Sequence, residues 1–211
     1  MEGSVSSIII SAGTSFIIPE VLRQLETFNF DVNKIDKLLI LHSHFDHVGV
    51  APFFMRYLPG MRVYASRRAI RRLKNRKVIE MINTLNRKAA KARGLQDELA
   101  VYDWEWGDGF GAIEVRDGDR ISLGDTAIHV LETPGHSQCS ISAYVPRLKA
   151  LFPSDGGGVP FRNTIIVYGT SDYGEFQKSL LKLTELEVRF LCADHYGYVV
   201  GFGYAFVWYS H

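Results

Sequence analysis

One short segment limits the possible folds of this 211-residue chain more than any other feature. Residues 38–41 are four consecutive apolar residues, the pattern of a strand buried on both faces. Four potential metal ligands follow directly within six residues: His42, His44, Asp46 and His47. A buried strand that ends in such a cluster predicts a sheet with a polar site at one edge.

The spacing within this segment, the 42–47 loop, predicts two neighbouring half-sites. In an extended backbone His42 and His44 project to the same side, because side chains alternate with a period of two. Two imidazoles can then reach one cation at about 2.0–2.1 Å, the zinc–nitrogen distance. Asp46 and His47 lie across the turn into the next helix and face a neighbouring point.

The remaining ligands must come from elsewhere, because a closed zinc site of paired cysteines is excluded. The two cysteines, Cys139 and Cys192, form no CxxC motif. Three further candidates, His136, Asp155 and His195, each follow an apolar run, and each has a glycine within two residues. Loops at strand ends are where rigid scaffolds place reactive groups, so we expect these residues to join the 42–47 loop.

The rest of the chain mixes short helices and strands. Helices are expected after Pro19, after the 42–47 loop to residue 57, over 66–93, and after Asp172, where Glu175 completes a capping-box pattern. Strands are expected at residues 7–10, 38–41, 61–65, 113–115, 120–123, 127–131, 140–145, 150–152 and 188–192. Residues 94–111 indicate a loop. Hairpins in the second half favour a layered α/β domain with partly antiparallel sheets.

Residues 66–93 are strongly basic in a chain whose charges otherwise balance. They hold eleven of the 24 Lys and Arg residues and one of the 23 Asp and Glu residues. The formal net charge of +1 excludes a protein whose whole surface binds polyanions. The segment is interpreted either as a solvated amphipathic helix or as a cap that attracts anionic substrates. Nucleic acid is disfavoured, because base-stacking aromatic residues are not interleaved with these cations.

No targeting or membrane signal is present in the sequence. The start has no basic region, and the apolar run at residues 8–10 is too short for a signal peptide. No apolar stretch could span a bilayer, so a cytoplasmic protein without a membrane partner is predicted. Residues 196–211 contain seven aromatic residues, and four of them alternate as in a strand: Phe202, Tyr204, Phe206 and Trp208. This tail is expected to pack on the sheet or to form a dimer contact.

The order of these motifs resembles the metallo-β-lactamase superfamily. The resemblance covers residues 8–198 and rests on the 42–47 loop, then Thr133-Pro134-Gly135-His136-Ser137, Asp155 and His195. It implies an α/β fold, a four-layer αββα sandwich with metals at one edge. The chain is then a single domain over residues 1–211, short at the N-terminus, with a basic helical insertion at about 66–111. Relatives often carry Asp where this chain has Ser11.

The resemblance also implies a role for each candidate residue. His42, His44 and His136 would bind a first metal, Asp46, His47 and His195 a second, and Asp155 would bridge the two. Asp46 and Asp155 are the expected catalytic carboxylates, because they offset the metal charge and can carry a proton. Two divalent ions are expected, zinc first, with iron or manganese as alternatives. They would share a hydroxide that attacks an ester, thioester or lactone carbonyl. Asp rather than Cys at position 155 is similar to the glyoxalase II and lactonase branches.

Two other functions fit the same residues. One is an iron-dependent oxidoreductase on the same fold, as in the persulfide dioxygenases. The other is a nucleic-acid-binding nuclease or a catalytically silent binding protein. Salt-dependent retention on RNA or DNA would support nucleic-acid binding. The expected partners are a small-molecule substrate, anionic if the basic segment faces the site, and a second copy of the chain if the aromatic tail forms a dimer contact.

Overall fold

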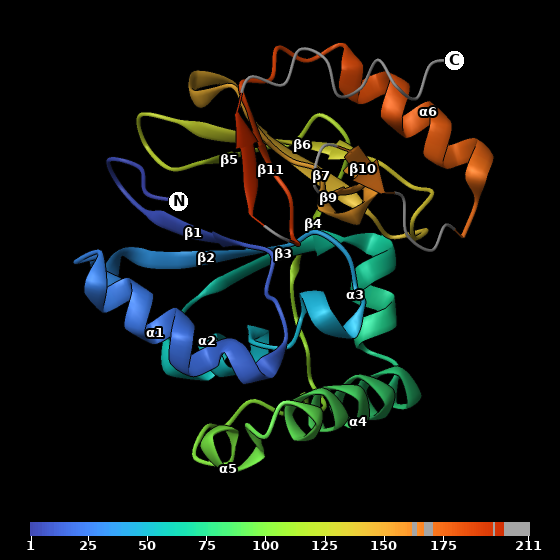
Figure 1. Ribbon diagram of the computed structural model, residues 1–211. Coiled ribbons are helices and arrows are strands. Elements are labelled where there is room, and N and C mark those ends of the chain that lie inside the picture. Colours follow the sequence, from blue (N-terminus) through green and yellow to red (C-terminus); the bar gives the residue numbers. More distant parts are fainter. Residues whose placement is uncertain (162–163, 167–170, 196, 201–211) are drawn as a thin grey trace.

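Two β-sheets stack face to face at the centre of the molecule, and helices cover the outer face of each (Figure 1). The computed structural model describes residues 1–161, 164–166, 171–195 and 197–200. The layers follow one another as helices, a four-stranded sheet, a six-stranded sheet and a helix. The predicted four-layer αββα sandwich is therefore confirmed.

The first sheet is parallel, and helices connect its strands. Its strands are β1 (Ser7–Ile10), β2 (Ile35–Ile40), β3 (Arg62–Ser66) and β4 (Ile113–Val115), in that order. The connecting helices are α1 (Ile18–Thr27), α2 (Ala51–Tyr57), α3 (Arg67–Leu73), α4 (Arg76–Ala92) and α5 (Gln96–Leu99). Parallel neighbours require such crossovers, because a tight turn can join only antiparallel strands.

The second sheet is mostly antiparallel, as its short connections predict. In spatial order it contains β12 (Tyr198–Val200), β11 (Phe190–Cys192), β8 (Ala150–Phe152), β7 (Ile141–Val145), β6 (Ala127–Glu132) and β5 (Arg120–Ser122). Only β8 and β11 pair in parallel among its described pairs. The crossover between them contains the hairpin of β9 (Val159–Phe161) and β10 (Thr164–Ile166) and then α6 (Tyr173–Thr184). The predicted cap is present, since Asp172 Oδ1 accepts a hydrogen bond from the Glu175 N–H.

Three buried clusters fill the three interfaces between the layers. Leu38 and Ile40 pack toward the helices, whereas Leu39 and Leu41 pack toward the second sheet. This alternation explains why residues 38–41 are all apolar, because both faces of β2 are covered. The third cluster, which includes Phe176, packs α6 on the outer face of the second sheet. The end of β2 is thus held from both sides immediately before His42.

Residues 94–111 form the predicted loop apart from one short helix. They contain the single-turn helix α5, and three of their aromatic side chains are buried: Trp104, Trp106 and Phe110. These rings extend the core cluster beneath the first sheet, so the segment is packed rather than solvated. The interpretation of residues 66–111 as an insertion stays a prediction. No helix within the described residues is both long and apolar enough to span a membrane. Of the aromatic tail, residue 196 and residues 201–211 lie outside the described part.

Candidate metal centre

Loops that leave four strands bring all seven predicted site residues together. The 42–47 loop follows β2, His136 follows β6, Asp155 follows β8 and His195 follows β11. Their ligand atoms form two groups within which all atoms lie within 4.8 Å of one another. One group is His42, His44, His136 and Asp155, and the other is Asp46, His47 and His195. A third group, His42, His47 and Asp194, shares one residue with each of them. This grouping is compatible with two half-sites, and the division of the ligands between two metal ions stays a prediction.

Asp155 lies between the two groups. Its Oδ2 atom is 3.4 Å from His136 Nε2 in the first group and 3.2 Å from His47 Nε2 in the second. Its Oδ1 atom is 3.5 Å from His195 Nε2. This is the position expected of a bridging carboxylate, although the individual ligand roles stay predictions.

The side chains present fit divalent metal ions. Three of the buried side-chain atoms without a hydrogen-bond partner among the described residues belong to this cluster: His42 Nε2, His47 Nε2 and Asp155 Oδ1. Buried polar atoms are rarely left unsatisfied, and a bound cation would satisfy these. Two ligands of a tetrahedral zinc ion are about 3.3 Å apart. His44 Nδ1 and His136 Nε2 lie 3.1 Å apart, close to that spacing.

Two residues that the sequence did not single out orient the imidazoles. Asp194 Oδ2 lies 2.9 Å from His47 Nδ1, and Ser154 Oγ lies 2.7 Å from His42 Nδ1. In both rings these contacts engage Nδ1 and leave Nε2 directed at the cluster. A metal-binding imidazole usually donates its other nitrogen to a carboxylate or another oxygen. Asp194 and Ser154 each stand directly before a predicted ligand, and that adjacency is the signal that could have found them.

The protonation states of the cluster follow from burial and from its carboxylates. Burial and the neighbouring imidazoles hold the pKa of His42 well below its usual value, so this ring is neutral at pH 7. Burial also lowers the pKa of His44. Burial alone would lower the pKa of His47, but the carboxylates of Asp155 and Asp194 raise it to about 10. Burial opposes ionisation of Asp155, yet the nearby His47 keeps its pKa below the usual value.

The centre is closed on one side and open on the other. The side chains of His42 and His47 are at most 1% exposed, whereas those of Asp46 and His195 are 28% and 35% exposed. A substrate would therefore approach from the side of Asp46 and His195. Ser43 also lies within the 42–47 loop, where its Oγ accepts a hydrogen bond from Arg72 Nε at 2.9 Å.

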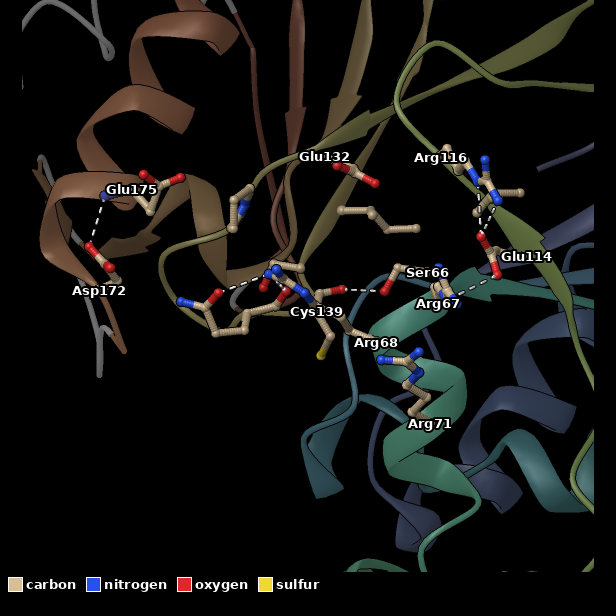
Figure 2. Close-up of a pocket in the computed structure, with 15 residues that line it drawn as sticks. Ser66, Arg67, Arg68, Arg71, Glu114, Arg116, Glu132, Cys139, Asp172 and Glu175 are labelled. Atoms are coloured by element: carbon tan, nitrogen blue, oxygen red, sulfur yellow. Dashed lines mark hydrogen bonds and ion pairs between the residues drawn. The ribbon is translucent and has the colours of Figure 1, made fainter.

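A cavity of about 680 Å³ lies beside the loop that follows His136 and is separate from the candidate metal centre (Figure 2). Its lining includes none of the seven site residues. Basic residues of α3 face it from one side and carboxylates from the other: Arg67, Arg68 and Arg71 against Glu132, Asp172 and Glu175. Arg68 also donates to the Gln138 carbonyl at 2.9 Å. With this mixed lining, the cavity is not a uniformly positive entrance for anions.

Comparison with known proteins gives consistent matches over most of the chain. The sequence model described as the metallo-beta-lactamase superfamily matches residues 6–195. ST1585, a metallo-beta-lactamase fold-containing protein of Sulfurisphaera tokodaii, is 26% identical over 94% of this chain and 72% of its own length. A hydroxyacylglutathione hydrolase of a Bradyrhizobium species is 31% identical over 83% of this chain, which spans 53% of that protein.

Solved structures share the fold. The crystal structure of ST1585 from Sulfolobus tokodaii superposes with a TM-score of 0.69 at 23% identity, over 95% of this chain and 73% of that one. The metallo-beta-lactamase family protein TTHA1429 from Thermus thermophilus gives a TM-score of 0.67 at 18% identity, over 95% and 68% of the two chains. At these identities the structural matches show the arrangement of layers and nothing finer.

Proposed function

The chain belongs to the metallo-β-lactamase superfamily, and we propose that it is a dinuclear metal-dependent hydrolase of an ester, thioester or lactone. The observation that carries this proposal is the convergence of five imidazoles and two carboxylates, from four separate loops, on two adjoining points. Two bound divalent ions, zinc in the first instance, would lower the pKa of a water molecule to about 7 and polarise the substrate carbonyl.

Two carboxylates of the chain would have separate roles in the reaction. Asp155 would hold the two half-sites at a fixed separation, because its two oxygens face imidazoles of both groups. Asp46 Oδ2 lies 3.6 Å from His47 Nε2 and 3.8 Å from His195 Nε2, on the open side of the centre. A carboxylate in that place can take up a proton from the attacking water and return it to the leaving group.

The choice of substrate class has support from one relative. The Bradyrhizobium protein is named as a hydrolase of hydroxyacylglutathione, a thioester, and it is 31% identical over 184 residues. This chain spans about half of that protein, so the match says nothing about the other half of the relative. We therefore place thioesters first among the three substrate classes, followed by lactones and simple esters.

Elemental analysis of the purified protein, followed by a substrate screen, tests the proposal. The expected result is about two zinc ions per chain and hydrolysis of a thioester or lactone that a chelator abolishes. Iron as the bound metal, with persulfide oxidation and no hydrolysis, would instead favour the oxidoreductase alternative. A protein that binds no metal and hydrolyses none of the substrates would overturn the proposal.

A second candidate, a polyanion-binding or nuclease function, is favoured by the separation of charge along the chain. Eleven of its 24 basic residues lie at 66–93, with only one of its 23 acidic residues. Arg71 and Lys74 are exposed, and neither has an ion pair among the described residues. If this surface binds RNA, charge reversal at these two positions should abolish salt-dependent retention on RNA. Arg189→Glu, directly before β11, is the control and should leave that retention unchanged. Arg72 is unsuitable for the test because it contacts Ser43.

A further inference from the structure

The inward face of α4 makes polar contacts with the 42–47 loop. Asn86, in the middle of this helix, has a side chain that is fully buried. Its Nδ2 donates to the carbonyl of Phe45 at 3.0 Å, and its Oδ1 accepts from the N–H of Ser15 at 2.8 Å. A single amide therefore joins α4 to the 42–47 loop and to the loop that follows β1.

A second set of contacts links α4 to Val48, the residue directly after the 42–47 loop. Asn83, one helical turn before Asn86, exchanges two hydrogen bonds with the backbone of Trp106, each 2.9 Å long. The Trp106 indole Nε1 then donates to the carbonyl of Val48 at 3.0 Å. The side chain of Trp106 is 5% exposed, so these bonds are shielded from water.

The two contacts enclose a pair of predicted ligands. Asp46 and His47 stand between Phe45, whose carbonyl is held by Asn86 of α4, and Val48, whose carbonyl is held by Trp106. The backbone of His47 is also fixed toward β1, since its carbonyl accepts from the Ala12 N–H at 3.0 Å. With both flanking carbonyls held, the turn that carries these ligands has little freedom to rotate.

We infer that Asn83, Asn86 and Trp106 form a brace that positions Asp46 and His47 for the second metal ion. Asparagine is a poor residue for a helix interior, and a buried amide is tolerated only when it is fully hydrogen-bonded. Asn86 bonds to the 42–47 loop, and Asn83 bonds to Trp106, which in turn holds Val48. Two buried asparagines one turn apart would destabilise the helix without a benefit if this face served only for packing. The inference rests on the proposed function, because it assigns a metal to the group of Asp46, His47 and His195.

Zinc titration of the metal-free protein against a chromophoric chelator tests the brace without any substrate. Asn86→Ala removes the contact with Phe45, and Trp106→Phe removes only the indole bond to Val48 while keeping a buried ring. Each should weaken one of the two zinc affinities about 10–100-fold, as loss of an outer partner of a ligand does, and leave the other unchanged. If Asn86→Ala does not fold, the zinc affinities of Trp106→Phe alone test the brace.

Asn75→Ala is the matched control. Asn75 caps the start of the same helix, where its Oδ1 accepts from the Lys77 N–H at 3.0 Å, and it makes no contact with the 42–47 loop. This variant should weaken α4 but leave both zinc affinities intact. Provided that the wild type binds two zinc ions, either of two results would overturn the brace. One is an equal loss of zinc affinity in all three variants, and the other is no loss in Asn86→Ala and Trp106→Phe. A wild-type protein that binds no zinc would instead contradict the proposed function itself.

Discussion

The imidazoles of His42 and His47 lie in one cluster but in opposite protonation states. Burial among other imidazoles keeps His42 neutral, and its ring contacts a hydroxyl, Ser154 Oγ. His47 lies between two carboxylates, and its pKa of about 10 keeps a proton on the ring in the metal-free protein. A neutral ring can bind a cation at once, whereas a protonated ring must first lose its proton.

Zinc uptake should therefore release a proton from His47 and strengthen as the pH rises. Because the folded pKa is raised above the usual 6.5 to about 10, the stabilisation from this proton is complete below pH 6.5 and is lost toward pH 10. Metal affinity should rise up to about tenfold per pH unit across that range. Calorimetric titration at pH 8 in two buffers of different ionisation enthalpy measures the protons released. A count of zero, with an affinity that does not change between pH 7 and 9, would contradict this assignment.

Loss of a single predicted ligand should reduce metal binding while the protein still folds. His44 is only partly buried, and its Nδ1 lies beside His136 Nε2 at the cluster. His44→Ala should lower hydrolysis at least about 100-fold and reduce bound metal, because even outer partners of a ligand contribute 10–100-fold. His129→Ala is the control, since His129 lies on β6 opposite Arg120 and outside both groups. A His44→Ala protein with full metal content and full activity would remove His44 from the centre.

At the scale of the elements, α6 packs closely against the loop that carries His136. Gly135 has a φ of +135°, and a Cβ added there would lie 2.3 Å from Phe176 Cα in α6. The Gly135 carbonyl also accepts from the N–H groups of Ser171 and Asp172 just before that helix, at 2.8 and 3.0 Å. Helix α6 and the His136 loop therefore cannot move apart without breaking these contacts.

Gly135→Ala should destabilise the protein and disturb His136 together. Overpacking of this kind costs about 1–3 kcal/mol, and the positive φ adds strain for any side chain. Gly174→Ala in the first turn of α6 is the control, because a Cβ there meets nothing closer than Asp172 Oδ1 at 3.6 Å. Urea unfolding and zinc content of both variants measure the effect. A Gly135→Ala protein as stable and as metallated as Gly174→Ala would show that the loop adapts.

At the scale of the whole molecule, sequence patterns predicted the layers and the seven converging residues but not what orients them. The apolar run at 38–41 and the 42–47 loop are local signals, so the buried strand and the site at its end could be read directly. Asn86 and Trp106 act across 41 and 58 residues of chain, and nothing near them in the sequence indicates their partners. The loop predicted at 94–111 is present apart from α5, but the burial of its aromatic residues could not be predicted, because their core cluster consists mostly of residues far away in the sequence.

The three core clusters consist of apolar residues packed between the layers, which predicts that metal stabilises the molecule without being needed for its fold. None of the seven candidate ligands belongs to these clusters. An ion present at 1,000 times its dissociation constant adds about 4 kcal/mol, or roughly 8–16 °C in Tm for a chain of this size. Chelation, which removes both proposed ions, should therefore lower the Tm by at least that amount while the far-ultraviolet circular dichroism at 25 °C stays unchanged, and added zinc should restore the Tm. Loss of helical signal on chelation at 25 °C would mean that the ions hold the layers together.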